Sequence, residues 1–392
     1  MSTFVAASLE QWHTKRTVTS EVFAVTQKNQ HQTPASRCIR LGFVPLSDCA
    51  PLVIASELGL FDKYEVRVRL SREIGWATIR DKICYGELDA AHALGPMVFA
   101  AGLGLESPQI DCLTGLVLNR HGNAITLSKP LWESARQYGG SLRGFLRDRR
   151  EKLVVGIPFL CSSHHFIVRS WLRLQGLSPE QMAHFVVVPP PQMAANLKAG
   201  HLSAYCVGEP WNSAAVLAGS GVVTATSAEI APLHPEKVLM VRRSWAESRG
   251  EEHVRLIAAL LEACSFCDAP QNQAQILELL SRREYVNAPI AVLRPGLVGR
   301  LGAIDAGEQV RDDFTVFARD DTNEPSEKKA SWILQGMRAS GLSGNSAAQD
   351  IALAKRVFRM EIFEQARRLR NSANSASEIT HELELQNQPA LS

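Results

Sequence analysis

The chain has 392 residues, of which 45% are hydrophobic and 21% are charged, so it is long enough to bury a large core and to divide into two lobes. Its 42 basic and 40 acidic residues leave a formal charge of +2, which predicts no broad field that would attract nucleic acid or a membrane surface. Any selectivity for charge is therefore expected to be local.

Residues 1–36 form a polar arm that we expect to be flexible. The arm has no apolar run long enough for a signal-peptide core and no twin-arginine pair, and the first cysteine, Cys38, falls inside a predicted strand. The chain contains no run of 18 or more apolar residues, which argues against membrane insertion. We expect a cytoplasmic protein, or a periplasmic one only if the natural start lies further upstream.

The first part of the chain alternates strands with helices of about ten residues, a pattern typical of βαβ units and a parallel sheet. We therefore predict an α/β fold in which residues 37–118 build the first part of lobe 1. The pattern predicts a strand at 38–48, a helix at 49–61, a strand at 65–71, and a helix followed by a strand at 75–94.

A second alternating series is predicted to form lobe 2, at residues 119–243. Ser178 is expected to cap a short helix, with a proline at the first helical position and Gln181 completing a capping box. Three prolines at 189–191 fit the start of another helix, because the first turn needs no internal N–H partners. Strands are predicted at 123–128, 152–158, 185–189 and 204–208, and a long helix at 162–176.

The last third of the chain reads as helices alone. Residues 244–370 are predicted to return to lobe 1 and to add C-terminal helices without intervening strands. Ser244 and Glu247 have the spacing of a capping box at the start of this region. Residues 371–392 are polar and are predicted to form a disordered tail.

The usual enzyme signatures for nucleotide binding, acyl transfer and zinc proteolysis are absent, so no catalytic residue and no cofactor are predicted. Cys264 and Cys267 form a CxxC, but they lie in a predicted helix and no second pair completes a metal shell. His164 and His165 are adjacent on a predicted helix, where neighbours diverge by about 100°, so they cannot face one site together. No metal site is therefore expected.

Five sequence blocks carry a family resemblance between about Cys38 and Arg294. The blocks are GWATIRDKI at 75–83, LDAAHALGPM at 88–97, VVVPPPQMAANLKAG at 186–200, VGEPWN at 207–212 and HPEKVLMVRRSW at 234–245. With these blocks in this order, the chain resembles the nitrate/bicarbonate-binding proteins of the NrtA/CmpA type. That resemblance implies a two-lobed, periplasmic-binding-protein-like (type II) fold with a cleft between the lobes and extra C-terminal helices.

The resemblance implies a binding site for nitrate or nitrite. Nitrate is a planar monovalent anion with three acceptor oxygens, so its site needs several donors and about one positive charge. Trp76 matches a tryptophan that lines the anion site in the family, and Lys237 matches the anion-binding lysine. Bicarbonate-binding relatives carry an acidic residue and calcium in that region, so Lys237 favours nitrate or nitrite without a metal. Asn123 stands where nitrate binders carry a glutamine, which keeps the amide donor but shortens its reach.

Other matching blocks add His92, His164 and Gly208 to the expected ligand contacts. Four more residues are expected to position the ligand-contacting side chains without touching the ligand: Thr78, Gln192, Glu209 and Trp211. Glu209 has no proton to give nitrate, so we expect it to orient a donor or to pair with Lys237 or a histidine. Pro210 and Trp211 are expected to shape the turn from strand to helix.

Within the family, the missing export signal makes the chain similar to NasS-type cytoplasmic nitrate/nitrite sensors. That similarity implies a protein partner, a NasT-like ANTAR antiterminator that is released when the ligand binds, and no direct contact with nucleic acid. The alternative is the substrate-binding component of an ABC-type nitrate importer. A third hypothesis is a pyrimidine-synthesis enzyme of the same fold, suggested only by Cys161-Ser-Ser-His164.

Overall fold

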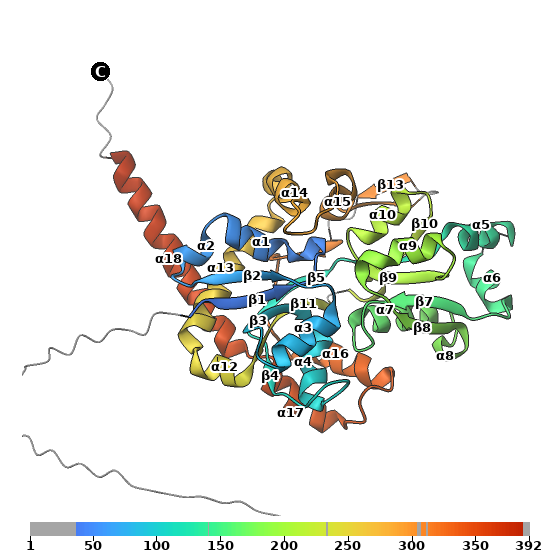
Figure 1. Ribbon diagram of the computed structural model, residues 1–392, viewed down its shortest axis with the longest axis horizontal. Helices are drawn as coiled ribbons and strands as arrows, with labels where there is room; N and C mark the ends of the chain where they lie inside the picture. The colour runs from blue at the N-terminus through green and yellow to red at the C-terminus, as the bar shows by residue number, and fades with distance from the viewer. Residues whose placement is uncertain (1–36, 140, 233, 304–306, 311–312, 387–392) are drawn as a thin grey trace, which may run out of the picture. The chain divides into compact units, whose positions relative to one another are not determined.

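The computed structural model describes residues 37–386 apart from 140, 233, 304–306 and 311–312. The predicted flexible arm at 1–36 and the last six residues of the predicted tail, 387–392, lie outside the described residues. Residues from 37 onward belong to one compact unit with two main β-sheets, whose strands occupy separate regions of Figure 1.

The first sheet has seven strands in the order β14-β5-β11-β3-β1-β2, with β4 paired to β11. Strand β1 runs parallel to β2 and β3, whereas β11 runs antiparallel to β3 and β5. The strands are β1 (Ile39–Phe43), β2 (Val68–Arg72), β3 (Ala90–Leu94), β4 (Cys112–Leu113), β5 (Val117–His121), β11 (Pro235–Arg242) and β14 (Thr315–Val316).

The second sheet has five strands in the order β10-β6-β9-β7-β8. Strand β7 runs parallel to β8 and β9, and β6 runs antiparallel to β9 and β10. The strands are β6 (Asn123–Ser128), β7 (Leu153–Ile157), β8 (Ala183–Val187), β9 (Ala204–Gly208) and β10 (Gly221–Thr226). The mixed α/β fold predicted from the alternating pattern is confirmed.

The chain passes between the two sheets twice. It leaves the first sheet at Gly122, whose φ of 91° is a left-handed conformation that favours glycine, so β5 and β6 follow each other directly but join different sheets. It returns between β10 and β11 through the short helix α11 (Ser227–Ile230), which begins with a capping box between Thr226 and Glu229. The predicted lobe limit 118/119 falls a few residues before the first crossing. The limit 243/244 falls directly after β11, so it leaves a strand of the first sheet within the predicted lobe 2. Two lobes that move as units stay a prediction.

Helices cover both sheets. Those that pack on the first sheet or on one another are α1 (Ala50–Glu57), α2 (Leu60–Lys63), α3 (Trp76–Cys84), α4 (Gly95–Leu103), α12 (Arg243–Ser248), α13 (Gly250–Asp268), α14 (Gln273–Ser281), α16 (Glu327–Ala339), α17 (Ala347–Val357) and α18 (Met360–Gln386). Those around the second sheet are α5 (Lys129–Gln137), α6 (Leu142–Asp148), α7 (Ser163–Leu174), α8 (Pro179–Met182), α9 (Met193–Lys198), α10 (Trp211–Leu217) and α11. Helix α15 (Ile290–Leu297) contacts α10 and α14, and the 3-10 helices are η1 (Ser47–Cys49), η2 (Pro190–Gln192) and η3 (Pro270–Asn272).

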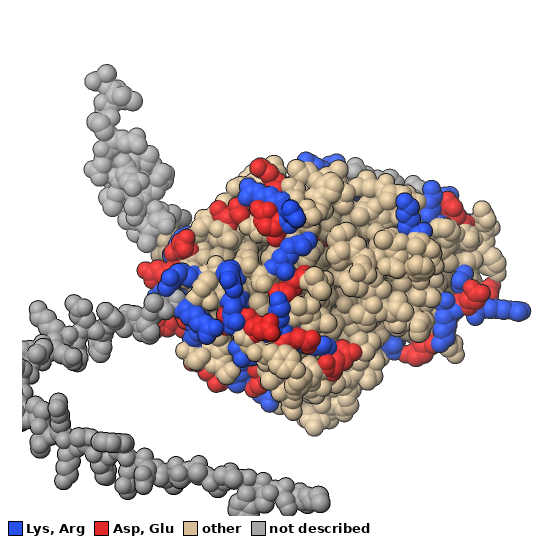
Figure 2. All heavy atoms as spheres, in the orientation of Figure 1, with Lys and Arg blue, Asp and Glu red and all other residues tan. Residues whose placement is uncertain are grey.

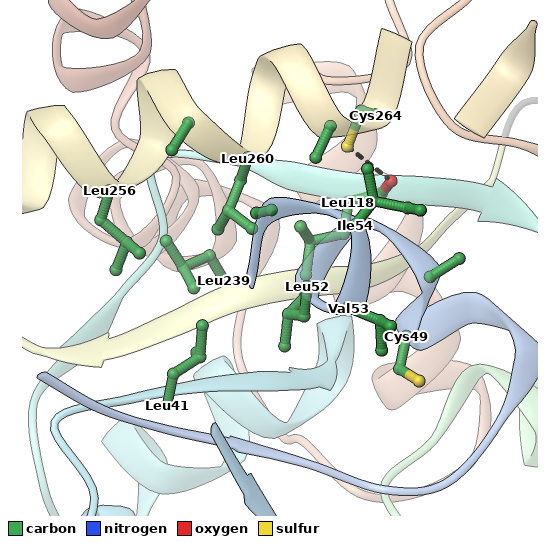
Figure 3. Packing of buried hydrophobic residues seen from close by; sticks show 14 of the residues in the cluster. Leu41, Cys49, Leu52, Val53, Ile54, Leu118, Leu239, Leu256, Leu260 and Cys264 are labelled. Atoms are coloured by element: carbon green, nitrogen blue, oxygen red, sulfur yellow. Dashed lines mark hydrogen bonds between the residues drawn. The ribbon is translucent and has the colours of Figure 1, made fainter. Parts of the chain in front are cut away.

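The largest hydrophobic cluster lies between the first sheet, α1 and α13. Figure 3 shows Leu256 and Leu260 of α13 pointing toward Leu52 of α1 and Leu239 of β11. The thiol of Cys264 donates a hydrogen bond to the Leu118 carbonyl over 3.6 Å. Cys264 and Cys267 are buried and free in α13, as the helical interpretation of the CxxC predicted.

Two helix-start predictions differ from the structure. Helix α12 starts at Arg243 with no side-chain cap, so the predicted capping box of Ser244 and Glu247 is wrong. The physical reason is that β11 continues through Arg242, which pairs with Cys112, and the chain turns into the helix immediately afterwards. Helix α8 does begin after Ser178, but the predicted side-chain cap with Gln181 is not formed.

The C-terminal region also differs. Short strands are present at β12 (Arg300–Ala303), β13 (Gly307–Val310) and β14, where only helices were predicted. Helix α18 extends to Gln386, through most of the segment predicted to be disordered from residue 371. Its first turns are anchored by buried Phe363 and Ala366 against the core, and a helix that is nucleated in this way extends readily. No helix among the described residues is long and apolar enough to cross a membrane.

Candidate functional site

A buried lysine marks the place where elements of both sheets meet. Lys237 lies on β11 and is completely shielded from solvent. Its Nζ is 2.7 Å from Oδ2 of Asp48 in η1 and 2.9 Å from Oε1 of its neighbour Glu236. A lysine is almost never fully buried without such partners. The three charged groups therefore form one unit at the end of the first sheet.

An irregularity in β11 explains how two consecutive residues contribute to one cluster. In a regular strand, neighbouring side chains point to opposite faces of the sheet. The pairing of β11 with β5 shifts register between Pro235 and Lys237 and again between Lys237 and Val238. Such bulges redirect side chains locally. The shift allows the carboxylate of Glu236 to reach the ammonium of Lys237.

Histidines and a serine surround the charged unit. His92 of β3 places Nε2 3.3 Å from Oδ1 of Asp48. His234 and His164 place their Nε2 atoms 3.4 Å and 3.8 Å from the Glu236 carboxylate. Ser163, the first residue of α7, donates its hydroxyl to Oε2 of the same carboxylate. Glu236 therefore connects β11 of the first sheet to the N-terminus of a helix on the second.

The charged unit is ionised at neutral pH. Burial raises the pKa of Asp48 and of Glu236, but Lys237 and the neighbouring histidines outweigh burial, so the pKa of Asp48 falls to about 2 and that of Glu236 lies well below its usual value. Burial lowers the pKa of Lys237, and the two carboxylates more than offset it. The pKa of His164 falls to about 4, chiefly through burial, so this ring is neutral.

Several polar atoms beside Lys237 have no hydrogen-bond partner within the described residues. They include the Trp76 indole N–H, both polar atoms of the Asn123 amide and the Ser47 hydroxyl. Buried polar groups are nearly always satisfied, so this concentration of unpaired polar groups points to a place for a polar ligand. Trp76 and Asn123 are 1% and 0% exposed, and the Trp76 ring centroid lies 5.5 Å from Nζ of Lys237.

Gly208 keeps this place open. It is the last residue of β9 and pairs with Asn123, the first residue of β6. A Cβ at this position would lie 3.4 Å from Oδ1 of Asn123 and 3.7 Å from Oδ2 of Asp48. All six residues expected to contact the ligand thus lie around the same buried centre: Trp76, His92, Asn123, His164, Gly208 and Lys237.

Two of the four supporting residues lie behind this centre. Glu209 is buried and accepts a hydrogen bond from the Ser213 backbone N–H at 3.2 Å, and burial raises its pKa to about 7. The expected alternative in which it pairs with Lys237 is not observed, because Asp48 and Glu236 occupy that ammonium. Trp211 begins α10, and its carbonyl accepts the Tyr205 hydroxyl at 2.8 Å.

The other two, Thr78 and Gln192, lie at a separate cavity of about 670 Å³. This cavity is bordered by the first turn of α3, by residues 158–160, and by Val187, Pro189, Pro191 and Gln192. Trp76 lines it as well, so the indole lies between the open cavity and the buried lysine. Thr78 and Gln192 therefore line this cavity and not the buried centre.

Sequence reasoning missed four residues of the centre: Asp48, Ser163, His234 and Glu236. Glu236 stands beside Lys237 in the HPEK block, but the alternation of a regular strand would have put its side chain on the opposite face. Asp48 is the last residue of the first predicted strand, at the carboxyl edge of the sheet, where residues gather near ligands. The position of Asp48 could therefore have been recognised from the sequence, whereas the bulge in β11 could not.

Two motif interpretations can be compared with the geometry. His164 faces Glu236, while His165 contacts the Leu160 carbonyl at 3.0 Å and the Phe185 ring, so the two rings diverge as predicted. The Cys161 thiol donates to the Pro96 carbonyl, and burial raises its pKa strongly. Across the described part of the chain, no group of three or more His, Cys, Asp and Glu side chains is arranged to hold a metal ion.

Comparisons with known proteins identify a family and several relatives of the chain. The profile of the NMT1-like family matches residues 32–281. The chain is 36% identical over 331 residues to the nitrate import ATP-binding protein NrtC of Synechocystis, covering 83% of this chain and 49% of the relative. The chain therefore spans about half the length of the first curated relatives it matches. It is also 30% identical over 326 residues to the nitrate/nitrite binding protein NrtA of Nostoc, covering 80% of this chain and 73% of that one.

The fold comparison agrees. The crystal structure of the periplasmic nitrate-binding protein NrtA from Synechocystis matches with a TM-score of 0.79 and 26% identity, over 85% of this chain and 89% of that one. The expected periplasmic-binding-protein-like fold is confirmed.

Proposed function

The chain belongs to the NMT1-like family, and on that premise we propose that it is a binding protein for nitrate or nitrite that serves anion import. The observation that carries this proposal is the buried Lys237, surrounded by the unpaired donors of Trp76 and Asn123. An indole N–H, an amide and an ammonium supply what a small planar anion needs: donors and a positive charge. The NrtA relatives support the choice of ligand.

Selectivity for the anion is a property of this buried centre and not of the surface. Lysine and arginine side chains are interspersed with aspartate and glutamate on the face shown in Figure 2, in keeping with the formal charge of +2. A mixed surface gives little long-range attraction for anions. We therefore expect affinity to depend on substitutions at the centre and only weakly on ionic strength.

Calorimetric titration of the full chain with nitrate tests the proposal. We expect one nitrate per chain, bound equally well with and without a metal chelator, because an ammonium supplies the positive charge. Binding that disappears in chelator, or no binding of nitrate or nitrite at any pH between 5.5 and 8, contradicts it.

A second candidate function is a nitrate/nitrite sensor that releases a NasT-like ANTAR antiterminator in the cytoplasm. What supports it is the hydrogen bond from Ser163 to Glu236, because a ligand at this point alters a contact between elements of the two sheets. Co-purification with the products of neighbouring genes, with and without nitrate, separates the two functions. Release of an RNA-binding partner by nitrate, with reciprocal weakening of nitrate binding by about 5–150-fold, favours the sensor. Association with a permease favours import.

The environment of Cys161 does not support the enzyme hypothesis. A nucleophilic cysteine needs a lowered thiol pKa and a neighbouring base. Cys161 instead has a raised pKa and donates to a backbone carbonyl. A binding role is the better proposal.

A further inference from the structure

The buried centre carries more negative charge than an anion-binding site requires. One ammonium, Lys237, is balanced by two ionised carboxylates, Asp48 and Glu236, and His164 is neutral. The two carboxylates and the ammonium together therefore carry a net charge of −1 before any ligand arrives. Bringing a second negative charge into a buried place costs several kcal/mol unless that charge is compensated.

The Glu236 carboxylate is surrounded by groups of the kind that hold a bound anion. A carboxylate is planar, monovalent and delocalised over its oxygens, as nitrate and nitrite are. Its two oxygens are held by Lys237 Nζ at 2.9 Å and by the Ser163 hydroxyl at the start of α7. A helix N-terminus with a nearby cation is the usual environment of a bound anion. The donors expected to serve a ligand are thus partly engaged by the protein itself.

Building on the proposed function, we propose that Glu236 is an internal counter-anion: its carboxylate competes with nitrate for Lys237 and Ser163, so that nitrate binds together with one proton. Glu236 then determines both the affinity of the site and its dependence on pH.

Several titratable groups near Glu236 can accept this proton. The titratable and charged groups around the Glu236–Lys237 pair are Asp48 of η1, His92 of β3, His164 of α7, Cys206 of β9 and His234 before β11, and His121 of β5 lies against His234. Histidines beside carboxylates become easier to protonate when a further anion approaches. A proton on this cluster restores the charge balance that nitrate disturbs.

The substitution that isolates this effect is Glu236→Gln, which keeps the side-chain size and one acceptor oxygen but removes the charge. In the wild type, one proton per nitrate raises the nitrate Kd about tenfold from pH 6 to pH 7. We expect the variant to bind nitrate at least about tenfold more tightly than wild type at pH 7.5, with a Kd that changes less than about threefold over that interval.

Asp350→Asn is the matched control. Asp350 is also a buried, ion-paired carboxylate, 2.8 Å from Arg338, but it lies on α17 away from the centre. This variant is expected to keep the nitrate affinity and the pH dependence of wild type. Circular dichroism and thermal melts of all three proteins establish that each is folded.

Proton uptake by the wild type gives a second, independent measurement. Nitrate titrations in buffers of different ionisation enthalpy are expected to show about one proton taken up per nitrate near pH 7. This result stands even if Glu236→Gln does not fold. Nitrate binding without proton uptake and without pH dependence overturns the counter-anion proposal and leaves the proposed function intact. Absence of nitrate binding at every pH overturns both.

Discussion

Lys237 is a buried cation that holds two buried carboxylates of the fold together. Its ammonium joins Asp48 of η1 to Glu236 of β11, two groups that cannot remain buried and charged without it. The residue cannot therefore be tested as though it were a surface lysine. Charge reversal at this position would leave three carboxylates together and would confound loss of binding with loss of structure.

Lys237→Met is the more informative substitution. We expect nitrate binding to be lost, because the positive charge is gone, and the free energy of unfolding to fall by about 3–5 kcal/mol, the usual cost of breaking a buried ion pair. Adding Glu236→Gln in the same chain should recover part of the stability but not the binding. Urea denaturation and nitrate calorimetry measure the two effects separately. A Lys237→Met protein that binds nitrate normally would remove the lysine from the site.

Trp76→Phe tests the unpaired indole donor. Phenylalanine keeps the aromatic wall beside Lys237 but removes the N–H, so nitrate affinity should fall by about 0.5–1.5 kcal/mol, the net value of a typical neutral hydrogen bond. Wild-type tryptophan fluorescence is expected to respond to nitrate. With seven tryptophans in the chain, the variant is also the spectroscopic control. Unchanged affinity and an unchanged signal in Trp76→Phe would place the ligand elsewhere.

At the scale of elements, the centre depends on close packing between α15 and the end of β9. Gly296 of α15 lies directly against Glu209, and a Cβ at Gly296 would come within 2.4 Å of Cγ of Glu209. No side chain larger than hydrogen fits without moving the carboxylate. The glycine therefore allows α15 to pack closely against the Glu209 side chain, next to the end of β9.

Gly296→Ala is expected to destabilise the fold by about 1–3 kcal/mol, the usual cost of overpacking, although alanine is the better helix former. Gly250→Ala is the matched control, because Gly250 is also helical and its Cβ would meet nothing within 4 Å. The control should be neutral or slightly stabilising. Thermal melts of both variants measure this difference. Equal melting temperatures would show that α15 can shift to accommodate the added methyl group without a loss of stability.

At the scale of the whole molecule, buried ionisable groups set the dependence of stability on pH. Burial lowers the pKa of four histidines to about 4: His121, His164, His165 and His253. In the unfolded chain these rings take up protons near pH 6.5. The unfolded state therefore binds more protons than the folded state between about pH 6.5 and pH 4, and stability falls as the pH is lowered through this window.

Glu209 contributes to the pH dependence of stability with the opposite sign. Burial raises its pKa to about 7, above the ordinary value of 4.5, so its contribution is present at low pH and is lost as the pH rises toward 7. Below pH 6.5, proton uptake by the four histidines in the unfolded state lowers the free energy of unfolding, and this effect outweighs the opposite contribution of Glu209. We therefore expect the free energy of unfolding to be greatest near pH 6.5 to 7 and to fall steeply toward pH 4.5. Denaturant melts across pH 4.5–8 measure this curve. Glu209→Gln should change only the part between about pH 4.5 and 7, and a wild-type curve that rises toward pH 4.5 would contradict the assignment.

The sequence by itself determined the α/β class, the free cysteines of α13, and the candidate residues that lie around the centre. These features depend on local periodicity and on short blocks such as GWAT and HPEK, which carry their information within a few residues. It could not place the ends of elements whose limits depend on distant partners. Arg242 stays in β11 because it pairs with Cys112, and α18 is anchored through Phe363.

Only the tertiary structure decided the charge of the site. Asp48 and Lys237 are far apart in the chain, and their contact follows from the order of strands in the first sheet. Glu236 and Lys237 are adjacent, yet a regular strand would separate their side chains, and the shift in register against β5 brings them together. Periodicity describes a strand in isolation, whereas a bulge arises from pairing with another strand.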